Sequence, residues 1–342
     1  MDEKLPHFLN KALDLAAAGS FLTKTFTIYV LIVHTPKKMR HLSNLILVGI
    51  LWNFMGNSLF TFAHLIPMLP AQCFCLDGML SDYLESEFAG HFVTKLIVVT
   101  VLNTSLAVAL SFQFRYMEVV HSKRFASFHP AWGYIYCLLV YMASSSIIIV
   151  LYDNWSIPVV DYPLANQLPR GERLFCMQPH GLDKNLVIGY FVGAMCVGLL
   201  AVAFFSERSF RHLNQKHPGM HEKTILLQKR ILRNLLSLML IPIFSGGIPI
   251  LVFTACLYFN EMQEARLIFS ICIVIVLNYG TIYCITTLVV FKDYRKATKT
   301  ILMNVARSIS LFVFNREVHR TLRSMIGRPE KINRVLRNST VA

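Results

Sequence analysis

Long apolar blocks, separated by short charged segments, dominate the chain. Six runs of at least nineteen residues contain no Asp, Glu, Lys or Arg: Leu42–Leu76, Leu96–Phe114, Phe125–Tyr152, Asn185–Ser206, Asn234–Asn260 and Leu267–Phe291. A seventh run, Leu15–Val33, is interrupted only by Lys24. A helix needs about 20 apolar residues to cross the roughly 30 Å hydrocarbon core of a bilayer. The pattern predicts an all-α membrane protein with seven transmembrane helices in one bundle.

The composition supports this class. Of the 342 residues, 55% are hydrophobic and 15% are charged, whereas soluble domains average about 25% charged residues. The first residues carry mixed charge and no A-x-A-like cleavage site follows an apolar core, so we expect the first span to stay in place. We divide the chain into an extracellular N-terminus at 1–14, a seven-transmembrane domain at 15–291 and a basic cytoplasmic tail at 292–342.

The net charge of +14 follows the predicted topology. Four alternate segments together carry a formal charge of +19: residues 34–41, 115–130, 207–233 and 292–342. The four segments between them together carry −7: residues 1–14, 67–87, 153–184 and 261–266. Because basic loops stay in the cytoplasm, the N-terminus is expected outside and the tail inside. The charge is therefore explained without a nucleic-acid partner.

The third run predicts the helix at the centre of the bundle. Asn103 and Thr104 lie near the middle of Leu96–Phe114, where lipid offers no hydrogen-bond partners, so neighbouring helices are expected around them. The run ends at Arg115 and Tyr116, which are expected at a membrane face. The alternative is a peripheral span whose arginine reaches the lipid headgroups.

The first two spans contain ionisable residues. Lys24 lies about ten residues from His34, roughly 15 Å along a helix, and therefore near the bilayer centre. A lysine at that depth indicates a functional role. The alternative is that it bonds backbone carbonyls and hydroxyls, such as those of Thr23 or Ser58, or extends toward the outer face. His64, near the outer end of the second span, either lines a ligand cavity or is a satisfied interfacial histidine.

The predicted outer segments contain three cysteines. Cys73 and Cys75 lie in one segment and Cys176 lies in the next. Since the outer face is oxidising, we expect one disulfide from Cys176 to either Cys73 or Cys75, and the sequence does not choose between them. Asn154 begins an Asn-Trp-Ser glycosylation sequon on the expected outer side, close to the fourth span.

The sixth span contains Pro242 and Pro249, which predict a kinked helix able to move. Ordinary tolerance of proline in membrane helices is the alternative. The apolar periodicity of residues 222–234 predicts that this helix continues into the cytoplasm, and this extension carries Arg230 and Arg233.

After the seventh span, residues 292–305 place apolar side chains on one helical face and basic side chains elsewhere. The apolar face holds Ala297, Ile301, Leu302 and Val305. This arrangement predicts an amphipathic helix on the inner leaflet, in contact with membrane lipids.

Motifs for catalysis are missing from the sequence. It contains no HExxH, GxSxG, P-loop or CxxC motif, and no pair of carboxylates at the depth of a span. We therefore expect no enzyme, no metal site and no cofactor. A seven-span transporter or channel is the alternative to a receptor, but the inverted repeats, broken helix pairs and acidic residues within spans that would favour one are not found.

Four segments in chain order resemble motifs of nematode chemosensory serpentine receptors, namely the class H and class I groups of the Str superfamily. They are Tyr29–Met39 (YVLIVHTPKKM), Phe112–Tyr116 (FQFRY), Lys223–Pro249 and Asp293–Ile301 (DYRKATKTI). Gln113 and Phe114 replace the Glu-Asn pair that precedes the arginine in the family motif, and Asp293 replaces a proline. The acid adjacent to the arginine is therefore absent from this chain.

The resemblance implies a G-protein-coupled receptor in the plasma membrane of a sensory neuron, in its cilium. Such a receptor binds an odorant or pheromone-like chemical from outside. The resemblance also implies a heterotrimeric G protein as the partner inside. The residues that we expect at the coupling surface are Arg115, Tyr116, Lys123, Arg124, Arg230 and Arg233. The candidates for the ligand pocket are Lys24, His64, Asn103 and Thr104.

Overall fold

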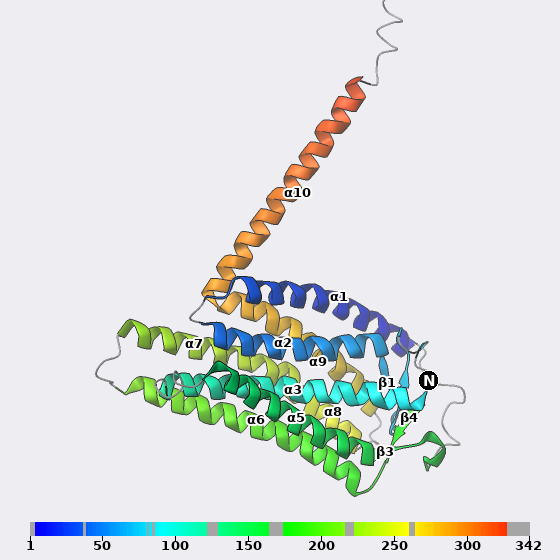
Figure 1. Cartoon of the computed structure of the whole chain (residues 1–342). Coiled ribbons are helices and arrows are strands. Elements are labelled where there is room, and N and C mark those ends of the chain that lie inside the picture. Colours follow the sequence, from blue (N-terminus) through cyan, green and yellow to red (C-terminus); the bar gives the residue numbers. More distant parts are fainter. Residues whose placement is uncertain are drawn as a thin grey trace, which may run out of the picture.

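The bundle contains seven helical segments that are long and apolar enough to cross a membrane, as the sequence predicts (Figure 1). The computed structural model describes residues 4–36, 39–79, 81, 83, 86–121, 129–163, 174–215, 222–259 and 264–326. The first five spans are α1 (Lys4–Val33), α2 (Arg40–Ala63), α3 (Glu87–Val120), α5 (Pro130–Trp155) and α6 (Leu182–Asn214). The sixth is made of α7 (Glu222–Ile241), η4 (Pro242–Gly247) and α8 (Ile248–Tyr258), and the seventh is α9 (Ala265–Val290).

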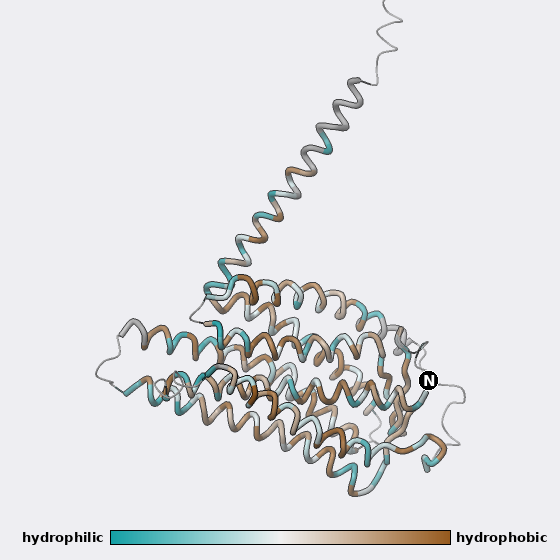
Figure 2. The backbone as a smooth tube through the Cα atoms, viewed as in Figure 1, coloured by the Kyte–Doolittle hydropathy of each residue, from teal (hydrophilic) through white to brown (hydrophobic). Residues whose placement is uncertain are grey.

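The outward faces of these helices are apolar, which suits contact with lipid chains. Figure 2 shows apolar residues along the full length of the bundle helices. Many of them are exposed at the surface, for example Leu139 on α5 and Leu200 on α6. Such a surface is unfavourable in water but not in a bilayer, because lipid tails are as apolar as these side chains.

Helix α3 occupies the centre of the bundle. It packs against α2, α5, α6 and α7 and also contacts strand β4 (Leu174–Met177). Asn103 and Thr104 on this helix are both buried. The prediction of a central third span is therefore confirmed, and the alternative of a peripheral span is wrong.

One end of the bundle is covered by a small β-sheet that the all-α prediction missed. The strands are β1 (Leu65–Pro67), β2 (Cys73–Leu76), β4 and β3 (Ser156–Ile157), paired in the order β1-β2-β4-β3. A short 3-10 helix, η2 (Val159–Asp161), follows β3. Strands of two to four residues are too short to show an alternating pattern, which explains the omission. We call this the sheet end; α1 starts there, and α10 leaves from the opposite tail end (Figure 1).

The sixth span changes its helical geometry at Pro242. Residues Pro242–Gly247 form a π-helix between two α-helical segments. Proline has no N–H group to donate to the preceding turn, and the two glycines that end the segment tolerate altered backbone geometry. The sequence predicts a kink at Pro242 and Pro249; the structure has a π-helical segment at Pro242, whereas Pro249 lies in the first turn of α8, where proline is well tolerated.

Helix α10 (Lys292–Ile326) is longer than predicted and runs obliquely away from the tail end (Figure 1). Ala297 and Ile301 pack against the bundle, as expected, whereas Leu302 and Val305 are exposed. Tyr294 is buried, and its hydroxyl lies 3.1 Å from the hydroxyl of Thr35 at the end of α1. Burial raises the pKa of Tyr294, so it remains a neutral anchor for the start of this helix.

Candidate functional site

A cavity of about 130 Å³ lies between α2, α3, α6, α8 and α9. Its apolar wall includes Trp52, Phe60, Phe191, Ile250, Phe253 and Val276. Its polar groups come from Asn53, Asn57, Thr100, Thr104 and Tyr279. An apolar pocket with a few polar groups is typical of a small-molecule site, and a cavity of about 150 Å³ can hold a molecule the size of benzene.

The polar groups of the cavity are held by bonds to the bundle. The Asn57 side-chain amide donates to the carbonyl oxygen of Leu277 at 2.7 Å, which joins α2 to α9. The Thr104 hydroxyl donates to the carbonyl oxygen of Thr100 at 2.7 Å, within α3. These bonds leave the methyl group of Thr104 available for apolar contact. The cavity therefore presents a mostly apolar surface with a small number of fixed polar positions.

The sheet closes the bundle next to this cavity. Phe74 of β2 and Phe175 of β4 stack with ring centroids 5.7 Å apart, and Phe74 also contacts Phe269 on α9. Gly90 on α3 makes this approach possible, since a Cβ atom at this position would lie 2.4 Å from the Phe175 ring. Cys73 and Cys176 are paired across β2 and β4 and form a disulfide. Of the two partners that the sequence left open for Cys176, the structure therefore selects Cys73.

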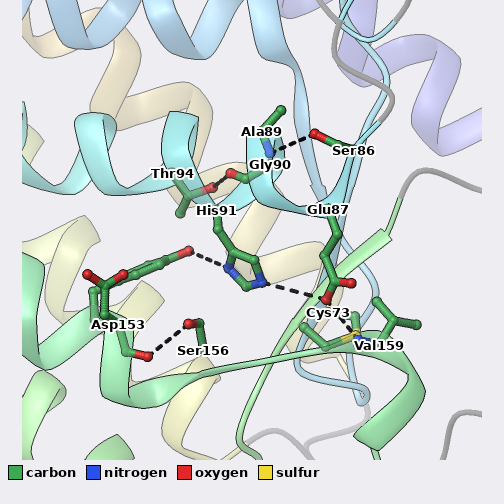
Figure 3. A network of polar contacts seen from close by, with 12 residues as sticks. Cys73, Ser86, Glu87, Ala89, Gly90, His91, Thr94, Asp153, Ser156 and Val159 are labelled. Carbon is green, nitrogen blue, oxygen red and sulfur yellow. Dashed lines mark hydrogen bonds and ion pairs between the residues drawn. A yellow bond between two sulfur atoms is a disulfide. The ribbon is translucent and has the colours of Figure 1, made fainter.

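A polar network fixes the sheet end of α3 to the segments that follow α5 (Figure 3). The Glu87 carboxylate accepts a hydrogen bond from the backbone N–H of Val159 at 2.8 Å, and lies 3.8 Å from Nε2 of His91. The other ring nitrogen of His91 lies 3.3 Å from the hydroxyl of Tyr152. Lys95 pairs with Asp153 at 2.6 Å. Side chains on one face of α3 thus hold both α5 and η2.

The four ligand-pocket residues predicted from the sequence do not lie together. Thr104 lines the cavity, but Asn103 exchanges hydrogen bonds with Ser145 on α5 instead. His64 ends α2 with a positive φ of 42°, and its Nε2 atom lies 3.5 Å from the carboxylate of Asp14. Neither Asn103 nor His64 is among the residues that line the cavity. Their roles in ligand binding stay predictions.

Lys24 is fully buried in the bundle, so it does not extend toward a membrane face. Its Nζ atom has no hydrogen-bond partner among the described residues. The suggested bonds to Thr23 or Ser58 are therefore not formed. Lys24 does not line the 130 Å³ cavity either, although Asn53 beside it does.

Sequence reasoning missed most of the cavity wall. Trp52, Phe253 and Val276 come from three different helices, and nothing in their local sequence separates them from lipid-facing residues. Asn57 and Tyr279 carried a weak signal, because polar side chains within a span need partners inside the bundle. Polar side chains within a span occur both at helix–helix contacts and at ligand contacts. The signal therefore could not identify which residues line the cavity.

At the tail end, Arg115 is buried and pairs with Glu118 at 2.6 Å, one turn along α3. Its Nε and Nη2 atoms have no hydrogen-bond partners among the described residues. From the sequence alone, the candidate partners of Arg115 are polar groups at the ends of the sixth or seventh helix, or Glu118; among the described residues the structure selects Glu118. Two guanidinium donors therefore remain available for a different arrangement of this end.

The other predicted coupling residues lie around this end. Tyr116 packs on Phe205 of α6 with ring centroids 5.4 Å apart. Arg230 and Arg233 are exposed on α7. Lys123 and Arg124 lie outside the described residues.

The family comparison decides the class. A model of the family described as "Serpentine type 7TM GPCR chemoreceptor Srh" matches residues 4–304. The chain belongs to this family. The resemblance noted from the four sequence motifs is thereby confirmed, and the protein is a multi-pass membrane chemoreceptor of the Srh type. Comparison with curated proteins yielded no match.

Membership of the Srh family also bears on the remaining predictions. This is a family of receptors and not of enzymes. Among the described residues, no group of three or more His, Cys, Asp or Glu side chains is placed to hold a metal ion. Asn154 is the exposed penultimate residue of α5. Its glycosylation stays a prediction.

Proposed function

We propose that this Srh receptor binds a small, mostly apolar chemical in the cavity between α2, α3, α6, α8 and α9 and activates a heterotrimeric G protein at the tail end. The sheet end faces outward and the tail end faces the cytoplasm, in agreement with the charge of the loops. The receptor acts at the plasma membrane of a sensory neuron, in its cilium. The basic face of α10 contacts anionic lipids of the inner leaflet.

The position of the cavity carries this proposal. Its wall includes Ile250 and Phe253 on α8, directly after the π-helical segment at Pro242. The opposite wall belongs to α2, α3 and α9, of which α2 packs against both α3 and α9. A ligand that binds more tightly to one position of α8 shifts the population toward that position. Since α8 and α7 form one span, the change reaches the end that holds Arg115.

At the tail end, the guanidinium group of Arg115 is the group that contacts the G protein in this proposal. In the structure its charge is satisfied by Glu118 alone among the described residues. When α7 moves, the planar guanidinium group can turn to the G protein and bond backbone carbonyls, with Arg230 and Arg233 nearby on α7. The exposed basic residues favour an acidic partner and increase the rate of association.

A screen of small chemicals with a second-messenger readout tests the ligand and the G protein together. We expect an agonist whose response is abolished by Val276→Phe, which fills the cavity. The matched control is Ile275→Phe on the same helix, because Ile275 is 40% exposed on the outer surface and should tolerate the ring. Equal responses from both variants would show that the ligand binds elsewhere.

Epitope tags test the orientation separately. A tag at Met1 should be stained by antibody on intact cells, and a tag after Ala342 only after permeabilisation. The reverse pattern would contradict the receptor topology.

A further inference from the structure

A groove of about 410 Å³ lies at the tail end, between the last turn of α9 and the first half of α10. Helix α10 leaves the end of α9 obliquely at this point (Figure 1). The groove shares no lining residue with the ligand cavity. Its volume falls in the range of about 300–1,000 Å³ that is typical of ligand pockets. The wall includes Leu288, Val289, Arg295, Lys299, Leu302 and Met303.

The described residues of this wall carry two positive charges and no negative charge. Arg295 and Lys299 lie one turn apart on α10, so both are on the same face of the helix. Both side chains are exposed, and among the described residues neither forms an ion pair. A guanidinium group and an ammonium group side by side are complementary to a phosphate group.

The remainder of the wall is mostly apolar and lies open. Val289, Leu302 and Met303 are each more than half exposed. Val289 belongs to the seventh span, so this part of the groove continues the surface that contacts lipid chains. Leu302 lies two turns after Arg295 on the same face of α10. The groove therefore combines two cations with an apolar surface that reaches the hydrocarbon region.

We propose that this groove binds one anionic glycerophospholipid, with its phosphate group beside Arg295 and Lys299 and part of an acyl chain along Val289, Leu302 and Met303. The proposal rests on the proposed function, which places the tail end at the inner leaflet, where anionic lipids are concentrated. It makes the general contact of α10 with lipid into one defined site. A free phosphate ion would leave the apolar wall uncovered, so the groove fits a lipid better than a soluble anion.

The test uses the purified full-length receptor in detergent micelles, without agonist or G protein. Thermal unfolding is measured while phosphatidylserine is added, and phosphatidylcholine with the same acyl chains is the reference. We expect the Tm to rise further with phosphatidylserine and to saturate, because a ligand that binds only the folded state stabilises it. Glycerol phosphate, which has the anionic group without acyl chains, should not reproduce this rise.

A pair of double variants locates the charged part of the site. Arg295→Gln combined with Lys299→Gln should abolish the difference in Tm between the two lipids. Lys292→Gln combined with Lys296→Gln is the matched control. It removes the same charge from exposed residues of α10 that do not line the groove, so the difference should remain.

A pair of single variants locates the apolar part. Met303→Glu places a carboxylate where the acyl chain is expected and should reduce the difference in Tm. Leu311→Glu adds the same charge at an exposed position of α10 outside the groove, and the difference should equal that of the wild type.

Three results would overturn the proposal. If the two lipids have equal effects on the wild type, both the groove site and the general contact of α10 with anionic lipid fail. If the two double variants lose the difference equally, only the groove site fails, because the charge of α10 as a whole then attracts the lipid. If glycerol phosphate reproduces the rise, the site binds phosphate and not a lipid. None of these results bears on the agonist or on the G protein, which are absent from the experiment.

Discussion

The two ends of the bundle are held together in different ways. At the sheet end, a disulfide, four paired strands and the side-chain bonds of α3 connect segments that are distant in the sequence. At the tail end, the buried Arg115 is paired with a residue of its own helix. Bonds between elements resist relative motion of those elements, whereas a bond within one helix does not. The tail end also has hydrogen bonds between elements, between Tyr294 and Thr35 and from Asn234 to Val290, but Arg115 can change its partner without breaking any of them. The sheet end, next to the proposed ligand cavity, is the more heavily cross-linked of the two.

The disulfide should contribute most to the rigidity of the sheet end. Cys176→Ser removes a cross-link between residues 103 positions apart, and the loss of such a bond typically costs about 2–5 kcal/mol. We expect a large fall in surface expression, measured by staining intact cells. Cys75→Ser is the control, because Cys75 lies on the same strand but outside the disulfide, and it should remain near the wild-type level. Equal surface levels and thiol labelling in the two variants would contradict the bond.

Arg115 tests whether the tail end carries the coupling function. Arg115→Ala, and largely Arg115→Lys, should abolish agonist-evoked signalling while surface expression survives, because lysine lacks the planar fork of donors. Losing one charged hydrogen-bond partner costs about 2 kcal/mol, which corresponds to a factor of tens in coupling. The measurement is second messenger normalised to surface receptor. Full signalling by the lysine variant would leave Arg115 only as a membrane anchor.

Gly90 tests the contact between the sheet and α3. Gly90→Ala places a methyl group against the Phe175 ring, because the added Cβ atom would lie 2.4 Å from the nearest ring carbon. We expect a loss of about 1–3 kcal/mol in the free energy of unfolding, as for other overpacked cores. Gly193→Ala is the matched control, because nothing lies within 4 Å of its Cβ position on α6. The measurement is thermal unfolding of the two purified variants. Equal stability would show that the sheet shifts to accommodate the methyl group without loss of stability.

The smallest effect is expected for the ion pair between Lys95 and Asp153. The Asp153 side chain is half exposed, and exposed pairs contribute about 0–1 kcal/mol. Lys95→Met should therefore shift the thermal midpoint only slightly, and a double variant with Asp153→Asn should give nearly the same value. A loss as large as that of Cys176→Ser would mean that polar bonds, rather than the disulfide, dominate the sheet end.

The sequence by itself determined the class of the protein. Charge-free runs of nineteen or more residues require helices that cross a membrane, since lipid cannot satisfy an open backbone. The central third span, the irregularity at Pro242 and the pair of Arg115 with Glu118 also follow from local patterns, because each depends on residues close together in the chain. The outward orientation of the N-terminus and the coupling role of Arg115 stay predictions.

Only the tertiary structure decided which polar residues meet. Asn103 and Thr104 are neighbours in the sequence, but successive residues of a helix point about 100° apart, so one bonds α5 and the other lines the cavity. The choice of Cys73 over Cys75 likewise depends on the register between β2 and β4. Lys24, Asn53 and Gly280 come together from three helices, and no local pattern contains that contact. The rotation of each helix and the register of each strand are set by packing across the whole bundle.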